Sequence, residues 1–234
     1  MNIVTIRREP ALSEAMERLR AEVLGCLLQP SLDAFDDRSI HVSAFSDGRP
    51  IGMVRVTPST PSVLAAWAAD EWKLPVGNDI AELTRGVVAP AWRRGGVYRL
   101  LMLEVMTGLR PDEVRMATAA VEPDFVGRRF LESLGFRAEG EPQVFRDAPR
   151  QATLAVPIWT EVDLGQNRRW TLMLSQLREE LAAQGIAVAV EPNRDLPASE
   201  AATQDSKHPR QGSTTPFTRY CALTAVPPTI CRVP

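Results

Sequence analysis

The residues best suited to chemistry lie in one window, where an apolar run leads into a basic turn that contains glycine. The run spans Ile80 to Val88, and the turn Arg93-Arg94-Gly95-Gly96 comes directly before a second apolar stretch that begins at Val97. Free N–H groups at a helix start, with arginines beside them and glycines that permit close approach, form an anion site. The window therefore predicts a phosphate-binding turn, although a solvated Arg-Arg turn with glycine caps has the same pattern.

The window resembles the motif with which the GNAT (Gcn5-related N-acetyltransferase) family holds the pyrophosphate of coenzyme A. The family pattern is Gln/Arg-x-x-Gly-x-Gly/Ala; Arg93 and Gly96 match it, and Tyr98 departs from it at the last small position. A second segment, Asp124 to Phe136, resembles the family's Asn-x-x-Ala-x-x-Phe-Tyr-Glu-Lys-Leu-Gly-Phe, with Leu131 where many members carry a tyrosine that protonates the leaving thiolate. The resemblance implies that the donor contacts Val87, Val88, Arg93, Arg94, Gly95, Gly96, Val97, Asp124 and Arg128.

The first half of the chain is similar to the acyl-homoserine-lactone synthase branch. Those enzymes carry an arginine with a valine three residues later, an acidic aromatic stretch, a hairpin with Asp-Gly and Gly-x-x-Arg, a Pro-Thr-x-x-Pro loop and Glu-x-Ser-Arg. The matching elements, in the same order, are Arg20 and Val23; Asp33, Phe35 and Asp36; Asp47-Gly48 and Gly52–Arg55; Thr57–Leu64; and Glu82–Arg85, with Thr84 for serine. The Arg-Arg-Gly-Gly turn is closer to long-chain N-acyl amino acid synthases. The whole resemblance covers residues 1–158.

The resemblance implies acyl transfer from a thioester to an amine. The donor would be acyl-CoA or acyl carrier protein (acyl-ACP) bearing a long chain on phosphopantetheine, and the acceptor an amino acid, an amine or a peptide. We expect Glu82 to be the general base, because a buried carboxylate among apolar side chains is suited to taking a proton. Backbone N–H groups near Val87 and Val88 are expected to stabilise the oxyanion. A structural ion pair between Glu82 and Arg85 is the alternative role for the carboxylate.

Five further charged residues are expected to order the N-terminal segment or to contact the acceptor or carrier. They are Arg20, Asp33, Asp36, Arg55 and Arg85. A surface ion-pair network would use the same residue types. The tryptophans Trp67, Trp72 and Trp92 would line an acyl tunnel, or else belong to the core.

Two other functions fit the same motifs. The first is transfer of an acetyl group from acetyl-CoA to a small molecule or peptide, which Arg93, Arg94 and Gly96 favour. The second is a non-catalytic GNAT-like module that binds acyl-CoA, which the missing tyrosine at position 131 allows.

Apolar periodicity supplies the elements that must position these residues. It predicts helices at residues 11–28, 95–109, 124–134 and 163–184, a hairpin at 41–56, and strands at 80–88, 114–121, 136–145 and 151–159. This order predicts an α/β fold: a GNAT-like mixed, mostly antiparallel central sheet flanked by helices, plus a C-terminal helix and a disordered tail. We expect an acyltransferase domain at 1–160, an amphipathic helix extension at 161–190 and a flexible tail at 191–234.

Composition narrows the class of protein. The chain has 234 residues, 44% of them apolar and 24% charged, with a net charge of −2, so nucleic acid is not an expected partner. The three cysteines and two histidines form neither a metal-ligand pattern nor a catalytic triad, so no metal is expected. No apolar stretch reaches 18 residues and the N-terminus lacks an apolar signal core. We therefore expect a cytoplasmic protein without a membrane span.

Overall fold

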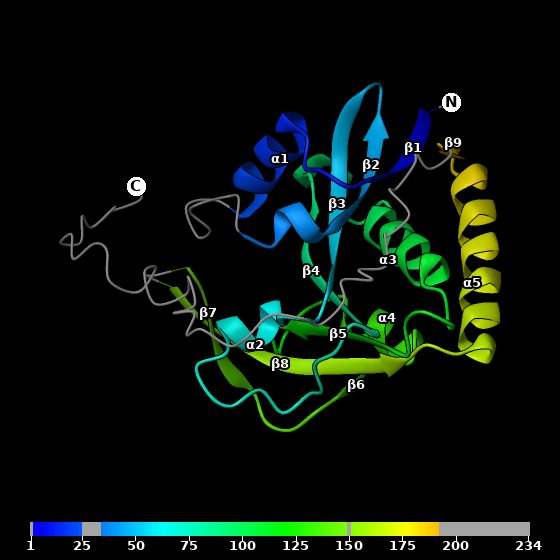
Figure 1. Ribbon diagram of the computed structural model, residues 1–234. Helices are drawn as coiled ribbons and strands as arrows, with labels where there is room; N and C mark the ends of the chain where they lie inside the picture. The colour runs from blue at the N-terminus through cyan, green and yellow to red at the C-terminus, as the bar shows by residue number, and fades with distance from the viewer. Residues whose placement is uncertain (1, 25–33, 149–150, 192–234) are drawn as a thin grey trace, which may run out of the picture. The chain divides into compact units, whose positions relative to one another are not determined.

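The structure, a computed structural model, describes residues 2–24, 34–148 and 151–191. Its strands form one sheet in the order β6-β8-β5-β4-β3-β2-β1-β9, and β7 pairs with β8 off this path (Figure 1). The strands are β1 (Asn2–Glu9), β2 (Ile40–Ser46), β3 (Arg49–Pro58), β4 (Ile80–Val88), β5 (Met116–Val121), β6 (Arg137–Ala138), β7 (Gln143–Ala148), β8 (Gln151–Glu161) and β9 (Ile186–Val190). The helices are α1 (Glu14–Leu24), α2 (Val63–Trp67), α3 (Val97–Gly108), α4 (Arg128–Ser133) and α5 (Leu164–Ala183), with short 3-10 turns η2 (Asp36–Arg38) and η3 (Pro90–Trp92).

Strand direction confirms the expected mixed, mostly antiparallel sheet. The pairs β1–β2, β2–β3, β3–β4, β5–β8, β6–β8 and β7–β8 are antiparallel. Only β1–β9 and β4–β5 are parallel among the described strands. The β4–β5 connection carries α3, as a parallel crossover requires.

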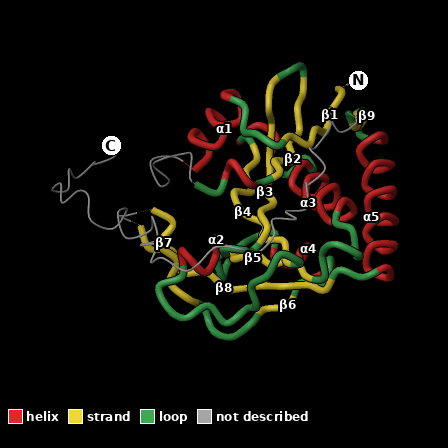
Figure 2. The backbone as a smooth tube through the Cα atoms, viewed as in Figure 1, coloured by secondary structure: helices red, strands yellow, loops and turns green. Residues whose placement is uncertain are grey.

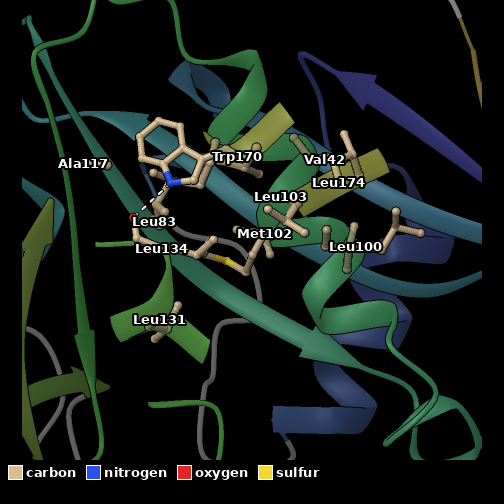
Figure 3. Packing of buried hydrophobic residues seen from close by; sticks show 14 of the residues in the cluster. Val42, Leu83, Leu100, Met102, Leu103, Ala117, Leu131, Leu134, Trp170 and Leu174 are labelled. Atoms are coloured by element: carbon tan, nitrogen blue, oxygen red, sulfur yellow. Dashed lines mark hydrogen bonds between the residues drawn. The ribbon is translucent and has the colours of Figure 1, made fainter. Parts of the chain in front are cut away.

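Helices cover both faces of this sheet (Figure 1, Figure 2). Along β2 and β3, alternate side chains point to opposite faces, so Ala44 and Val54 pack in the core under α3 and α5, whereas Phe45 and Met53 pack against α1. The α5 side chain Trp170 is fully buried, and its indole Nε1 donates to the Leu134 carbonyl at 2.9 Å (Figure 3). This bond fixes α5 to the end of α4.

Several predicted elements are confirmed and two need correction. The hairpin and the strand over residues 80–88 are present as expected. The helix predicted over 124–134 forms only at Arg128–Ser133, because residues 122–125 make a turn closed by a bond from the Phe125 N–H to the Glu122 carbonyl, at 3.0 Å. The single strand predicted over 136–145 is split into β6 and β7, because Gly140, with a φ of 71°, turns the chain out of the sheet.

Two strands at one side of the sheet, β1 and the edge strand β9, were not predicted from the sequence. Strand β1 buries Val4 and Ile6 and pairs with β2, and β9 follows the helix-ending Gly185, whose φ is 81°. The available signal was a run of β-branched residues at Ile3 to Ile6 and alternating β-branched residues over Ile186–Val190. The predicted tail lies almost entirely at residues 192–234, outside the described residues. Among the described helices, none has the length and hydrophobicity needed to cross a bilayer.

Candidate active site

A gap between β4 and β5 forms the centre of the site. Their ladder pairs Ile80–Leu83 with Met116–Ala119 and stops there, and the two strands separate beyond it. A bulge in β4 contributes to this separation, because the single residue Val54 on β3 faces both Arg85 and Gly86. Arg85 adopts the left-handed region with a φ of 55°, a strained conformation for a side chain other than glycine.

A cavity of about 840 Å³ fills this gap, within the size range of cofactor-binding sites. Its walls come from α1, α2, β4, the turn before α3, α3, β5, the β5–α4 segment and the β7–β8 hairpin. Most of the donor-binding residues predicted from the sequence line it, namely Val87, Val88, Arg93, Arg94, Gly96 and Val97, and Arg85 lines it as well.

One end of the cavity is basic. Arg93 and Arg94 are exposed there, and Gly96, with a φ of 80°, is the N-cap of α3. The first helical bond runs from the Leu100 N–H to the Gly96 carbonyl, at 2.9 Å, so the N–H groups before Leu100 precede the helical ladder and face the turn. A left-handed φ at Gly96 is what allows the chain to turn into the helix with those groups directed outward.

The strand edge beside the turn offers one backbone donor. The Ala89 N–H bonds to the Ile51 carbonyl at 2.9 Å, and hydrogen bonding alternates along an antiparallel pair. Val87 therefore directs its backbone polar groups to β3, whereas Val88 directs its own into the gap. The Val88 carbonyl accepts a bond from Arg93 Nε at 3.3 Å, which agrees with this orientation. Both residues line the cavity, but of the two expected oxyanion donors only the Val88 N–H is directed into the gap.

The opposite end of the cavity is apolar. Leu64 and Trp67 on α2 lie there with Phe145 and Ala155 from the β7–β8 hairpin, and Leu64, Phe145 and Ala155 form one buried cluster. Trp72 stands outside the cavity wall and packs edge-on against Phe145, with ring centroids 5.9 Å apart. The predicted tryptophan lining therefore holds for Trp67 and also for Trp92 near the basic end, whereas Trp72 supports the wall from behind.

Tyr98 lines the cavity from the first turn of α3, next to Gly86 on β4. Its ring packs edge-on against Phe125, with centroids 5.6 Å apart, and against Phe130 at 6.3 Å. Burial raises the pKa of the Tyr98 hydroxyl above its usual value. Leu131 lines the cavity and is buried, at the position of the family's usual tyrosine.

Glu82 has surroundings different from those expected. Its side chain is fully buried, but it does not line the cavity and it is not enclosed by apolar groups. One oxygen accepts from the hydroxyls of Ser59, at 2.6 Å, and of Ser62; the other accepts from the N–H groups of Val63, at 2.7 Å, and Leu64, at 3.2 Å. Arg85 is not among the carboxylate's partners within the described residues. The expected apolar environment was therefore wrong.

The charged residues of the first half form a buried cluster instead of a surface network. Arg20 and Arg55 both bind the Asp36 carboxylate, and all three side chains are buried. Arg55 Nε also donates to the Thr84 hydroxyl at 3.0 Å, and Thr84 lines the cavity. The Trp67 ring lies under the guanidinium of Arg85, 4.8 Å from ring centroid to carbon. The cluster reaches the cavity through Thr84 on β4 and through Trp67 on α2, whose ring centroid lies 5.7 Å from the Arg55 guanidinium carbon. Asp33 lies outside the described residues.

Three residues predicted to bind the donor do not line the cavity: Gly95, which lies within the basic turn, and Asp124 and Arg128. Asp124 and Arg128 are exposed and do not line the cavity, and Arg128 pairs with Glu132 at 3.1 Å. The segment between β5 and α4 reaches the cavity through Phe125, Val126 and Gly127 instead. No group of three or more His, Cys, Asp or Glu side chains within the described residues is arranged to hold a metal ion.

Comparisons with known proteins agree with this geometry. The sequence model of the Acetyltransferase (GNAT) family matches residues 6–136. No curated protein matches the chain. Among solved structures, the CoA-dependent acyl-homoserine lactone synthase BjaI, with SAM and isopentyl-CoA, matches with a TM-score of 0.57 and 19% identity, over 83% of this chain and 96% of BjaI.

A second solved structure with the same fold is an acyl-CoA N-acyltransferase from Pseudomonas aeruginosa. It matches with a TM-score of 0.51 and 15% identity, over 68% of this chain and 99% of its own. Identities this low show a common fold and no more. The family match spans more than half of the chain and includes β4, the basic turn and α3. This chain is therefore a transferase that belongs to the acetyltransferase (GNAT) family.

Proposed function

We propose that the protein is an N-acyltransferase that moves a long-chain acyl group from a phosphopantetheine thioester to the amine of an amino acid, another amine or a peptide. The observation that carries the proposal is the division of one cavity into a basic end at Arg93, Arg94 and Gly96 and an apolar end at Leu64 and Phe145. An acyl-pantetheine has the same division, with phosphate at one end and hydrocarbon at the other.

The donor would lie along the gap between β4 and β5. Its phosphate would meet the N-terminus of α3 and the side chains of Arg93 and Arg94. An amide N–H of its pantetheine arm would donate to the carbonyl that Val88 directs into the gap, as an added strand pairs with a sheet edge. Either coenzyme A or acyl carrier protein presents this arm, and the BjaI structure was obtained with isopentyl-CoA.

The reaction would form one bond and break another at the thioester carbonyl. The acceptor nitrogen adds to the carbonyl carbon, the carbon–sulfur bond breaks, and the proton that the amine loses is balanced by the proton that the released thiolate gains. Charge on the carbonyl oxygen would be stabilised by the Val88 N–H, and a donor of this kind contributes roughly 3 kcal/mol. Holding both reactants in one cavity lowers the entropic part of the barrier.

Thermal-shift titration tests the donor. We expect palmitoyl-CoA to raise the melting temperature at lower concentration than acetyl-CoA, because each buried methylene adds about 0.8 kcal/mol. Palmitoyl acyl carrier protein, titrated in parallel, separates the two carriers. Stabilisation by acetyl-CoA alone would instead favour a short-chain acetyltransferase. Mass spectrometry of extracts from expressing cells would then identify the acylated amine.

A further inference from the structure

Glu82 lies in the part of β4 that pairs with both β3 and β5, and its carboxylate meets four donors from a single segment. Ser59 and Ser62 supply hydroxyls, and Val63 and Leu64 supply backbone N–H groups, at the distances given above. All four lie in the segment between β3 and α2 or in the first turn of α2. A buried carboxylate thus holds this one segment at both of its oxygens.

These bonds cap α2. Val63 and Leu64 are its first two residues, and N–H groups in a first turn have no partner within their helix. Ser62, the N-cap, accepts the Ala65 N–H at 2.9 Å and so joins Glu82 to the next residue as well. A helix of five residues is too short to be stable by itself. The conformation of α2 therefore depends on Glu82 and on its packing.

That packing forms the apolar end of the cavity. Leu64 and Trp67 face the cavity from α2, and Phe145 faces it from β7. The two parts are joined by a β-bridge between Ala68 and Phe145 and by a bond from the Ala69 N–H to the Val144 carbonyl, at 2.8 Å. A shift of α2 would therefore move both the leucine and tryptophan side chains and their contact with the hairpin.

The same geometry argues against a role in proton transfer. A general base must reach the proton that it removes, directly or through one water. Glu82 does not line the cavity, and each of its oxygens already accepts two bonds from α2 and the segment before it. Moving it toward a substrate amine would break the cap of α2.

We infer that Glu82 is a positioning residue, which fixes the α2 wall of the acyl site and so determines which acyl chains bind. This inference rests on the proposed function, because it takes the apolar end to hold the acyl chain. It differs from the general-base role expected from the sequence in a testable way. Loss of a general base lowers kcat, whereas a displaced cavity wall changes the affinity for long acyl chains.

Two substitutions at this position separate the roles. In Glu82→Gln, the amide oxygen can accept from Val63 and Leu64 while the amide nitrogen donates to the serine hydroxyls, so α2 remains capped. In Glu82→Ala, all four bonds are lost. A base is removed equally by both substitutions, whereas a cap is removed only by alanine.

The measurements are kcat at several pH values and the dissociation constants of two unreactive donors, the hexadecyl and ethyl thioethers of coenzyme A. We expect Glu82→Gln to keep kcat within about threefold, with an unchanged pH profile, whereas loss of a base costs about 10²–10⁴-fold. We expect Glu82→Ala to bind the hexadecyl thioether about tenfold more weakly, the loss of roughly two methylene contacts, and to bind the ethyl thioether normally.

Contrary outcomes are distinct. A large loss of kcat in Glu82→Gln, with normal binding of both thioethers, would overturn the inference and support Glu82 as the general base. If Glu82→Ala fails to fold, Leu64→Ala tests the wall directly, and unchanged selectivity there would overturn the inference too. If the unmodified protein binds neither thioether, the proposed function itself fails.

Discussion

Arg20 and Asp36 form a buried ion pair with two parallel hydrogen bonds, from Nη1 to Oδ1 at 2.9 Å and from Nη2 to Oδ2 at 2.8 Å. Arg20 belongs to α1 and Asp36 to the turn η2, so the pair ties the N-terminal helix to the start of β2. Arg55 on β3 donates to the same carboxylate at 3.0 Å. One acidic side chain thus connects three elements that lie far apart in the sequence.

The Asp36→Asn variant should be strongly destabilised. Removing one partner of a buried ion pair leaves charge without compensation and costs about 3 kcal/mol or more. Urea unfolding followed by circular dichroism measures the loss. Asp112→Asn is the matched control, because Asp112 pairs with Arg110 in an exposed position, where removal should leave the urea midpoint nearly unchanged. Equal shifts of the urea midpoint in both variants would show that burial of the Asp36 ion pair does not determine its contribution to stability.

The arginines of the basic turn should act on donor affinity. Arg93 and Arg94 are exposed at the cavity mouth, and a hydrogen bond from a charged group contributes about 1.5–3 kcal/mol. The double variant Arg93→Ala/Arg94→Ala should therefore raise the KM for the donor at least roughly tenfold and leave kcat nearly unchanged, the signature of lost uniform binding. Arg169→Ala, an exposed arginine on α5 outside the cavity, is the control. A normal KM in the double variant would indicate that the donor phosphate binds elsewhere.

Local pattern predicted the part of the site that is local in sequence. Strand β4, the basic turn and α3 follow one another directly, so their order alone indicated an anion site beside a strand. The proposed role of Val88 was also expected from this order. What separated Val88 from Val87 was the pairing with β3, fixed by the bond from Ala89 to Ile51, which no local pattern contains.

Local sequence patterns could not predict the apolar end of the cavity. Leu64 and Phe145 meet there because α2 packs on the β7–β8 hairpin, and each residue alone reads as ordinary core. The surroundings of Glu82 were predicted wrongly for a similar reason. Its neighbours along β4 are apolar, but its side chain meets Ser59 and Ser62 across the strand pairing, where the sequence shows only a polar loop. A serine directly before a short apolar run was the usable signal, since it marks a helix N-cap.

Filling the apolar end should shorten the acyl chains that the protein accepts. Ala155 lines the cavity beside Leu64 and Phe145, so Ala155→Leu places three more carbons where the chain would end. We expect about tenfold weaker binding of palmitoyl-CoA and little change for acetyl-CoA, because overpacking costs about 1–3 kcal/mol. Isothermal titration calorimetry with both donors measures this. Ala152→Leu, an exposed change on the same strand, should alter neither value; a palmitoyl-CoA affinity unaffected in Ala155→Leu would place the acyl chain elsewhere.

His41 should make the fold less stable in mild acid. Its side chain is fully buried on β2, and its Nε2 donates to the Asp36 carbonyl at 3.3 Å. Burial lowers the pKa of His41 below its ordinary 6.5; the contact with Asp36 opposes this shift, and the charges of Arg55 and Arg20 add to it. Below pH 6.5 the unfolded chain binds a proton that the folded protein does not, so the free energy of unfolding falls as pH falls, by at most about 1.36 kcal/mol per pH unit for this one group.

The His41→Gln variant isolates that contribution. Glutamine can keep a donor near the Asp36 carbonyl but does not titrate, so its free energy of unfolding should fall less steeply between pH 6.5 and pH 5 than that of the unmodified protein. Between pH 7.5 and pH 8.5, where the histidine is neutral in both states, the difference between the two proteins should be constant. Urea unfolding at each pH supplies both comparisons. Parallel curves across the acid range would show that His41 takes up its proton equally well in the folded protein, against the burial seen here.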